Sequence, residues 1–145
     1  MRGWLLDTNV LSAFGPGKRP IPPGTAAWFR GRTEALYLST ISAAEIEAGI
    51  AKLRRTGSGR RADNLRQWFD LVLDDYADRL LTFDLAAARI AGLLGDLAQA
   101  DGRYPGFADV AIAAIAKSRE LVVLTLNLRH FDPLGIDALN PFEVD

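Results

Sequence analysis

A short apolar run near the start of the chain ends in a carboxylate. Residues Trp4 to Leu6 are followed directly by Asp7. A run that is apolar on both faces is typical of a strand buried inside a parallel sheet. The turn formers Thr8 and Asn9 come next, so we expect Asp7 to lie where this strand ends and the chain bends toward a helix. In open α/β sheets, that edge is where ligands bind.

Two interpretations of Asp7 remain open from its position alone. In the first, its side chain simply caps the following helix. In the second, it belongs to a functional site. A buried charge is costly unless a partner compensates it, and the segment around Asp7 offers no Lys or Arg close by. A metal ion is then the natural partner for this carboxylate.

Apolar runs alternate with helix-like segments, which predicts one α/β domain over residues 1–145 with a mainly parallel sheet of four to five strands. The expected strands are Trp4–Leu6, Leu36–Ser39, Leu80–Thr82, Leu121–Thr125 and a weaker one near Ile136–Leu139. The expected helices are Thr25–Arg32, Ala43–Arg55, Asp63–Leu73, Leu85–Ala100 and Ala108–Ser118. The stretch from Val110 to Ala116 is apolar all round, so we expect it to be central and buried.

The composition excludes several kinds of site. The chain has no cysteine and a single histidine, His130, which rules out thiolate metal sites, Cys nucleophiles and His-rich zinc centres. A net charge of -1 argues against binding nucleic acid with the whole surface, though not against a local basic groove. No apolar run approaches the ~20 residues of a membrane span, and Met1 to Leu6 is no signal peptide. We therefore expect a cytoplasmic protein without a membrane partner.

Three further carboxylates follow expected strands or begin expected helices. Glu45 lies in a Ser42-x-x-Glu45 pattern, which is typical of a capping box but also puts a carboxylate just past the end of a strand. Asp109 occupies the first turn of the apolar helix, where the helix dipole favours an anion by about 0.3–1 kcal/mol. Asp84 is most simply a helix N-cap.

Parallel strands would bring three of these carboxylates together. Asp7, Glu45 and Asp109 would face the same edge of the sheet, beside the end of strand Leu121–Thr125. Gathered anions repel one another unless a divalent cation neutralises them. Hard oxygen donors without thiolates point to Mg²⁺ or Mn²⁺. Such a site suits phosphodiester hydrolysis.

Four segments carry a family resemblance, in the same order and over nearly the whole length of the chain. They are Leu6-Asp7-Thr8-Asn9-Val10, Ser39-Thr40-Ile41-Ser42-Ala43-Ala44-Glu45-Ile46, Ala108-Asp109-Val110-Ala111-Ile112-Ala113-Ala114 and Val123-Leu124-Thr125-Leu126-Asn127, with Asn140-Pro141-Phe142 near the end. Through these segments the chain resembles the PIN-domain ribonuclease toxins of the VapC type, especially their FitB-like branch. Each segment alone is a weak match, whereas four in register are fairly specific.

The resemblance implies a three-layer α/β/α sandwich and a toxin of a type II toxin–antitoxin system that cleaves RNA with Mg²⁺, or with Mn²⁺. It also implies a cognate VapB-like antitoxin and a homodimer. Asp7 and Asp109 would be direct metal ligands. Glu45 would complete the acidic and catalytic cluster, as a ligand or by orienting the water.

The residues around this cluster include one departure from the family pattern. Many relatives carry a further Asp where this chain has Asn127, or a few residues on where it has His130. The alternative function is therefore a catalytically weak PIN scaffold that acts through its antitoxin and DNA. The side chains expected to support the site or touch substrate are Thr8, Asn9, Thr125, Asn127, Arg129 and His130.

Two surface segments each have two interpretations. The basic residues Lys52, Arg54, Arg55, Arg60, Arg61 and Arg66 are expected on a solvated helical hairpin, with phosphate binding as the alternative. The apolar residues Trp68, Phe69, Leu71 and Val72 are expected mainly in the core, with a groove for an amphipathic antitoxin segment as the alternative.

Overall fold

Five strands form one parallel sheet in the part of the chain that the computed structural model describes, residues 2–144. The strand order is β3-β2-β1-β4-β5. The strands are β1 (Trp4–Leu6), β2 (Leu36–Ser39), β3 (Leu80–Leu81), β4 (Val122–Leu124) and β5 (Ala138–Leu139). In the central pairings Trp4 lies opposite Leu36, and Leu6 lies opposite Leu124. The residue that follows β1 is therefore at the middle of the carboxyl edge of the sheet.

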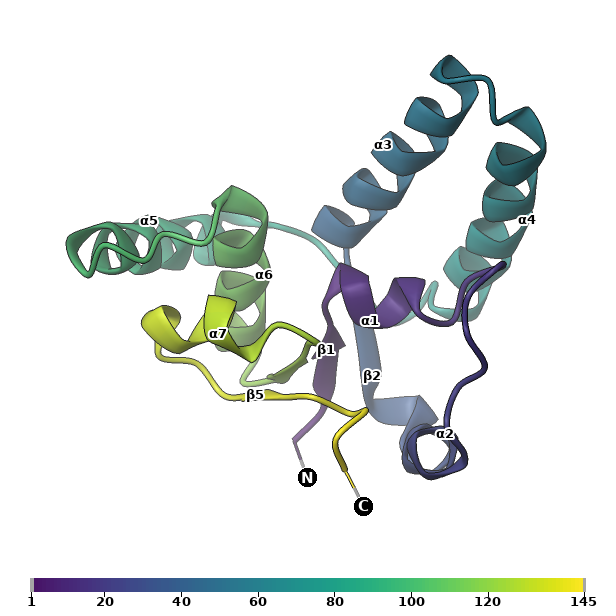
Figure 1. Cartoon of the computed structure of the whole chain (residues 1–145). Coiled ribbons are helices and arrows are strands. Elements are labelled where there is room, and N and C mark those ends of the chain that lie inside the picture. Colours follow the sequence, from purple (N-terminus) through teal and green to yellow (C-terminus); the bar gives the residue numbers. More distant parts are fainter. Residues whose placement is uncertain (1, 145) are drawn as a thin grey trace.

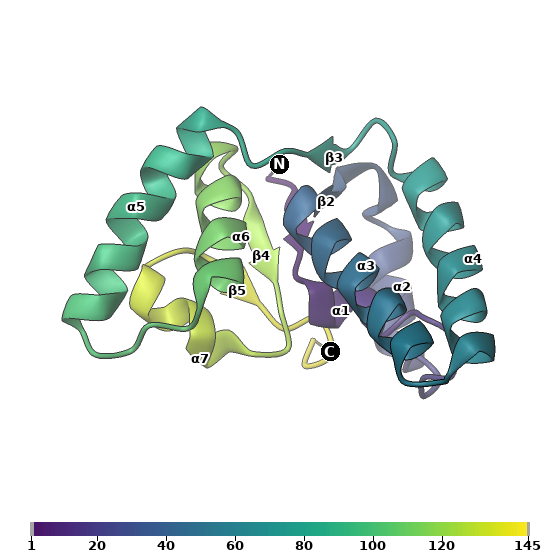
Figure 2. The same ribbon diagram turned by 90° about the horizontal axis from the view of Figure 1, so that it is seen from above.

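Helices connect successive strands and lie on both sides of the sheet (Figures 1 and 2). They are α1 (Thr8–Ser12), α2 (Pro23–Arg30), α3 (Thr40–Arg55), α4 (Gly59–Asp75), α5 (Leu85–Ala100), α6 (Phe107–Ser118) and α7 (Leu128–Phe131), with the 3-10 turns η1 (Thr33–Ala35) and η2 (Asp132–Leu134). Figure 2 shows α5, α6 and α7 on one side of the strands and α2, α3 and α4 on the other. The predicted three-layer α/β/α sandwich is confirmed.

The two faces of the sheet are covered through the alternation of strand side chains. Leu5 and Val123 belong to the core cluster that contains α5 and α6. Leu6 and Leu124, the next residue in each strand, belong to the cluster that contains α1 to α4. Consecutive strand residues thus pack into the cores on opposite faces of the sheet, which explains why these strands are apolar throughout.

Helix α6 is buried on all sides, as its composition predicts. Every residue from Val110 to Ala116 is at most 2% exposed. The helix lies between the sheet and α5, so its middle, residues 110–116, leaves no face for polar side chains, which occur only at its two ends. Its amino-terminal turn points Asp109 toward the carboxyl edge of the strands, because a helix that connects parallel strands runs antiparallel to them.

Some helix limits differ from the expectations. Helix α3 begins at Thr40 rather than Ala43, and α2 begins at Pro23, where proline suits the first helical turn. The helix expected after Asp7 is α1, for which no bounds were predicted, whereas α7 was not predicted at all, because four residues give too little periodicity to detect. Both prove to position residues of the candidate site.

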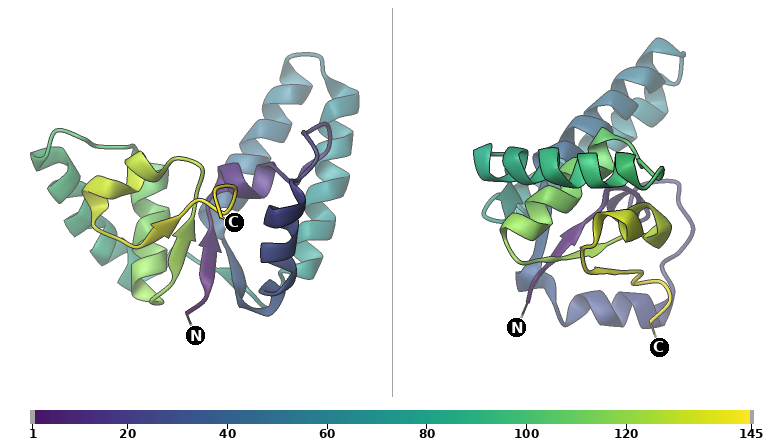
Figure 3. Two further views of the ribbon diagram at one scale, coloured as in Figure 1. Left: turned by 60° about the horizontal axis from the view of Figure 1, so that its bottom comes forward. Right: turned by 90° about the vertical axis from the view of Figure 1, so that its left-hand side faces the viewer.

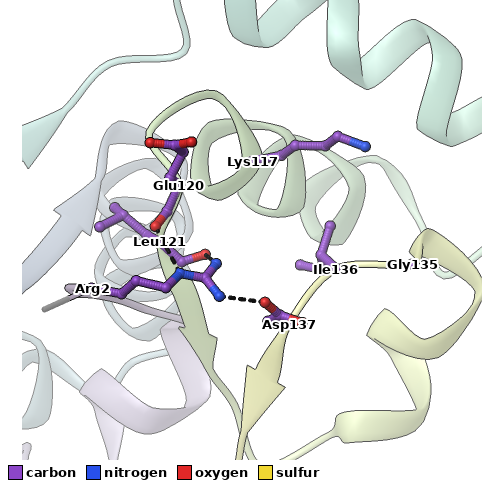
Figure 4. Close-up of a pocket in the computed structure, with 7 residues that line it drawn as sticks. All are labelled: Arg2, Lys117, Glu120, Leu121, Gly135, Ile136 and Asp137. Atoms are coloured by element: carbon purple, nitrogen blue, oxygen red, sulfur yellow. Dashed lines mark hydrogen bonds and ion pairs between the residues drawn. The ribbon is translucent and has the colours of Figure 1, made fainter.

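A pocket of about 390 Å³ lies at the opposite, amino-terminal edge of the sheet (Figure 4). Arg2 extends across it, pairing with Asp137 and donating to the backbone carbonyls of Glu120 and Leu121. The guanidinium of Arg2 therefore ties together the chain segments that lead into β1, β4 and β5. Among residues 2–144, no helix has the length and apolarity needed to cross a membrane.

Candidate active site

Asp7 is a buried carboxylate held at the end of β1. Its side chain is 5% exposed, and its backbone N–H donates to the carbonyl of Leu124 at 2.8 Å. The carboxylate accepts the N–H of Thr8 at Oδ1 (2.8 Å) and the hydroxyl of Thr125 at Oδ2 (2.9 Å). Asp7 caps α1, as the first interpretation expects, and it also lies at the carboxyl edge of the sheet, where the second interpretation places a functional site.

Thr8 links the first segment to α3. Its Oγ1 donates to Oε1 of Glu45 at 2.6 Å and lies 2.9 Å from Oγ of Ser42. A threonine hydroxyl has one hydrogen, so the Ser42 hydroxyl must donate to Thr8 in turn. Ser42 is buried, whereas Glu45 is exposed on the rim of the site.

The capping box expected at Ser42 and Glu45 is wrong. Ser39 is the N-cap of α3, and its hydroxyl accepts the N–H of Ser42 at 3.1 Å. The helix starts one turn earlier than the pattern suggested, so Glu45 lies past the first turn. Its carboxylate contacts Thr8 instead of the N-cap amide. Asp84, by contrast, caps α5 as expected, accepting the N–H of Ala87 at 2.9 Å.

Asp109 contacts the only histidine of the sequence. Oδ2 of Asp109 lies 2.9 Å from Nδ1 of His130, which α7 brings over from the end of β4. The Asp109 side chain is 19% exposed and that of His130 is 51% exposed. The position where relatives were expected to carry a fourth acid is thus occupied by an imidazole that contacts the site.

Burial and like charges act on the two aspartates. The pKa of Asp7 is raised to about 6, mainly by burial and also by the charges of Asp109 and Glu45, while the hydrogen bonds from Thr125 and Thr8 oppose this shift. Burial likewise raises the pKa of Asp109, against the opposing effect of His130. No Lys or Arg among the described residues contributes to the pKa of Asp7. Asp7 therefore lies among negative charges, with no Lys or Arg of the described chain acting on it.

The oxygen donors of this site fit Mg²⁺ by their chemistry. Within residues 2–144, no three side chains of the His, Asp and Glu types are close enough together to hold a metal ion among them. This is not the closed four-ligand cage of a structural zinc site. Mg²⁺ usually keeps several waters and binds one or two carboxylates. Asp7 and Asp109 can supply those two carboxylates.

The remaining predicted residues lie around the same edge but in different ways. The hydroxyl of Thr125, which donates to Asp7, also accepts the N–H of Asn127 at 3.0 Å. Oδ1 of Asn9 accepts the N–H of Leu126 at 3.2 Å, which ties α1 to the segment after β4. The side chains of Asn127 and Arg129 are exposed.

Sequence reasoning missed the part played by Ser39 and Ser42. Both side chains are buried at the junction of β2 and α3. Ser42 was assigned only to a helix cap, although it lies against Thr8. The signal that was present is the run Ser39-Thr40-Ile41-Ser42, in which either serine can cap a helix.

A comparison with known families identifies the domain to which these residues belong. The chain matches the PIN domain over residues 4–134. It belongs to the PIN-domain family. Three relatives of this PIN domain are similar over almost their whole length. Plasmid stability protein StbB of Pseudomonas syringae pv. tomato is 36% identical, with 96% of this chain and 98% of that protein aligned.

The other two relatives are named as a ribonuclease and a toxin. VapC ribonuclease Y4jK of Sinorhizobium fredii is 35% identical, over 96% of this PIN domain and 97% of that protein. Toxin FitB of Neisseria gonorrhoeae is 33% identical, over 95% and 97% respectively.

Solved structures agree with the sequence relatives. The PIN domain superimposes on a chain of FitAcB from Neisseria gonorrhoeae with a TM-score of 0.82 and 33% identity, covering 97% of this chain and 99% of that one. A chain of FitAB bound to an IR36 DNA fragment gives a TM-score of 0.80 and 31% identity, covering 98% and 97%.

The two surface segments of this PIN domain largely match the first interpretation given for each, a solvated hairpin and a place in the core. In the α3–α4 hairpin, Arg66 pairs with Glu47 and Asp70, and Arg54 pairs with Asp63, as expected for a solvated hairpin. On α4, Phe69 is buried, and Trp68 and Val72 pack against the same core. Leu71 is 69% exposed, so three of these four residues lie in the core, as expected for most of them, and Leu71 is the exception.

Proposed function

We propose that this PIN domain, over residues 1–145, is the toxin of a type II toxin–antitoxin system and a Mg²⁺-dependent endoribonuclease. Its similarity to VapC ribonuclease Y4jK and Toxin FitB over almost the whole chain supports this assignment. One observation carries the chemistry. A buried carboxylate with a pKa raised to about 6, Asp7, interacts with two other carboxylates and with no basic side chain. A divalent cation relieves that repulsion.

We assign Asp7 and Asp109 as the metal ligands, with Mn²⁺ as a possible replacement for Mg²⁺. Bound there, the ion supplies Lewis-acid polarisation of a phosphoryl oxygen and a lowered pKa for an attacking water. The N–H of Thr8 donates to one carboxylate oxygen of Asp7 and the hydroxyl of Thr125 donates to the other, and together they fix its orientation. His130 fixes Asp109. These contacts hold the two ligands before substrate arrives, which lowers the reorganisation that catalysis needs.

Glu45 is the residue assigned to proton transfer. It is exposed, and the Thr8 hydroxyl holds one of its oxygens, leaving the other free to accept a proton from water. Hydrolysis joins the water oxygen to phosphorus and breaks the P–O bond to the leaving nucleotide. The water proton passes to Glu45, and solvent protonates the leaving oxygen. Arg129, which is exposed and precedes His130 in the sequence, is assigned to contact the phosphate backbone.

The proposed partners follow from the relatives. Complexes named FitAcB and FitAB, the latter bound to DNA, support an antitoxin partner of the VapB kind. An apolar pocket of about 230 Å³ on α1, α2 and α4 is lined by Phe14, Phe29, Trp68 and Val72 among others, and suits an amphipathic antitoxin segment. We propose that an antitoxin Arg or Lys then enters the acidic site. A homodimer is also proposed, on the family resemblance.

Defined RNAs test the proposed activity. Purified protein is incubated with tRNA, rRNA and mRNA fragments, with Mg²⁺ or with chelator, beside the variants Asp7→Ala and Asp109→Ala. We expect cleavage only with the metal and the native residues. The variant Asp84→Asn is the matched control, because Asp84 caps α5 away from this cluster. Cleavage that persists in chelator or in both aspartate variants would refute the proposal.

A catalytically weak scaffold is the second candidate, favoured by one observation. Asn127 and His130 supply no fourth carboxylate, and Asn127 has an exposed side chain. In this case the protein acts by binding its antitoxin and DNA. Mg²⁺-dependent cleavage that Asp7→Ala abolishes would discard this candidate.

A further inference from the structure

A groove of about 580 Å³ opens along α1, the helix that Asp7 caps. It lies between α1, the loop that follows α1, and the segments that follow β4 and β5. Asn9 and Leu126 form its inner end, joined by the hydrogen bond between Oδ1 of Asn9 and the N–H of Leu126. Asn9 is two residues from Asp7, and Leu126 directly follows Thr125. The volume is in the range of small-ligand sites.

The outer wall of the groove carries two cations. Lys18 and Arg19 are exposed on the loop between α1 and α2 and line the groove. Within residues 2–144 neither forms an ion pair, unlike Arg54 and Arg66 of the α3–α4 hairpin. The prolines at 20 and 22 also line this wall and fix its backbone. Positive charge is therefore available on a preformed surface next to the acidic site.

The other wall is apolar. Leu126 is 40% exposed, and Ile21 and Phe142 are half-buried at the groove. In Figure 3 the carboxy-terminal segment that follows β5 crosses to the side of β1 on which α2 lies, and its Phe142 lines the groove together with Asn9 of α1. The turn that carries Phe142 is held by Asn140, whose buried Oδ1 accepts the N–H of Phe142 at 2.9 Å. An aromatic ring and an aliphatic side chain thus face two free cations across one groove.

We propose that this groove binds the nucleotide next to the cleaved phosphate in a single-stranded RNA. Lys18 and Arg19 contact the phosphate of that nucleotide, and Leu126 and Phe142 receive its base. The proposal rests on the endoribonuclease function proposed above. Base stacking on side chains with phosphate contacts to cations is how proteins hold single strands. A duplex keeps its bases stacked on each other, so it cannot fill the apolar wall.

Charge complementarity favours RNA over a peptide as the occupant. A cationic rim beside a carboxylate cluster suits a ligand with one phosphate over the metal site and another over Lys18 and Arg19. The antitoxin cation proposed above gains no attraction from this rim, so the apolar pocket on α1, α2 and α4 suits the antitoxin segment better than this groove does. The two prolines also leave this wall with fewer N–H groups to pair with a peptide backbone.

The first experiment measures RNA binding without cleavage. A fluorescent, unstructured oligoribonucleotide is titrated in chelator at several salt concentrations, and anisotropy gives the Kd. The double variant Lys18→Ala/Arg19→Ala should bind about tenfold more weakly, with a salt slope smaller by about 0.7, because both cations contact one phosphate and single strands lose about 0.7 per neutralised phosphate. The matched control Arg89→Ala/Lys117→Ala removes the same charge from exposed positions on α5 and α6 and should change the Kd less than twofold.

The second experiment tests the apolar wall. Phe142→Leu keeps an apolar side chain in the turn but removes the aromatic ring, so it should shift the base preference of cleavage while leaving the salt slope unchanged. The double variant Lys18→Arg/Arg19→Lys keeps both positive charges, so it should bind RNA with the native Kd. Thermal melting of each variant confirms that the fold is intact.

The outcomes separate this proposal from the activity on which it rests. RNA cleavage with unchanged Kd and KM in the Lys18→Ala/Arg19→Ala variant would overturn the groove and leave the ribonuclease function standing. RNA that binds through the groove but is never cleaved would overturn the function and keep the groove. An equal loss of affinity in the α5–α6 control would also refute the groove, since it would show general charge attraction.

Discussion

The hydroxyl of Thr125 donates to the carboxylate of Asp7 at 2.9 Å, although the two residues are 118 positions apart. The bond is buried and joins the ends of two neighbouring parallel strands, β1 and β4. Thr125 also accepts the N–H of Asn127, so one hydroxyl orders both the carboxylate and the start of the next segment. The position of Asp7 thus depends on the pairing of β1 with β4.

Replacing Thr125 with valine tests this dependence. Thr125→Val keeps the shape but removes the donor to Asp7 and the acceptor for Asn127, so we expect a loss of about 1–3 kcal/mol in the free energy of unfolding. RNA cleavage should fall at least tenfold because Asp7 loses its orientation. Urea unfolding and cleavage rates measure the two effects. Thr125→Ser retains the hydroxyl and should keep most of both, so equal damage from Ser and Val would count against the role of the hydroxyl.

The raised pKa of Asp7 makes the stability of the metal-free protein depend on pH. The unfolded chain releases this proton near the ordinary value of 3.8, whereas the folded chain keeps it until about pH 6. The folded state therefore binds the proton more tightly, and stability falls as pH rises from about 4 to 6, by about 3 kcal/mol in total. Urea unfolding in chelator measures this slope. In Asp7→Asn the part of the pH dependence that comes from this carboxyl disappears. If the free energy of unfolding of that variant fell with pH as steeply as in the native protein, Asp7 would not be the group responsible.

The burial of the Asp7 carboxylate predicts that replacing it raises stability and lowers activity. At pH 7 without metal, Asp7→Asn should raise the free energy of unfolding by about 1–2 kcal/mol, because it removes a buried charge near Asp109 and Glu45. The variant should also abolish RNA cleavage. In thermal melting, Mg²⁺ should raise the Tm of the native protein and leave that of Asp7→Asn unchanged. Asp84→Asn provides the control, since Asn caps a helix about as well as Asp.

Glu45 and Glu47 form a matched pair on α3. Glu45→Gln keeps an oxygen that can accept from Thr8 but removes the proton acceptor, so cleavage should fall about a hundredfold or more with little change in stability. Glu47 pairs with Arg66 on the exposed hairpin, and Glu47→Gln should leave cleavage unaltered. Single-turnover rates at saturating Mg²⁺ compare the two. Similar rates for both variants would remove Glu45 from the proposed mechanism.

Asn127 gives a gain-of-function test. Its backbone already donates to Thr125, which contacts Asp7, and its side chain is exposed at the same edge. Asn127→Asp adds a negative charge there, and ligand charge tunes the affinity of oxygen-donor sites. We expect Mg²⁺ to bind about tenfold more tightly, as measured by isothermal titration calorimetry on the RNA-free protein. No gain would indicate that His130 has replaced the fourth acid in function.

The sequence predicted the sheet better than it predicted the site. The apolar runs at Trp4–Leu6 and Leu36–Ser39 match β1 and β2, because strands buried on both faces have an unambiguous composition. Parallel pairing then brought Asp7 and the end of β4 together as expected. The contacts among the side chains of the candidate site were not predicted, because they depend on local features that leave no periodic pattern in the sequence.

Two of those details come from local structure. The true start of α3 was hidden because Ser39 and Ser42 are equally good caps, and the choice between them moves Glu45 by one turn. The contact between His130 and Asp109 was hidden because it needs the four-residue helix α7. Neither the start of α3 nor the His130–Asp109 contact could be inferred from the hydrophobic pattern, because both depend on tertiary contacts.

The placement of β1 between β2 and β4 has a consequence for synthesis. The ribosome makes Asp7 102 residues before Asp109. A chain that stops between them lacks Thr125, which hydrogen-bonds to Asp7, and Asp109, whose charge raises the pKa of Asp7. The proposed reaction centre therefore forms only after β4 has been made and has paired with β1.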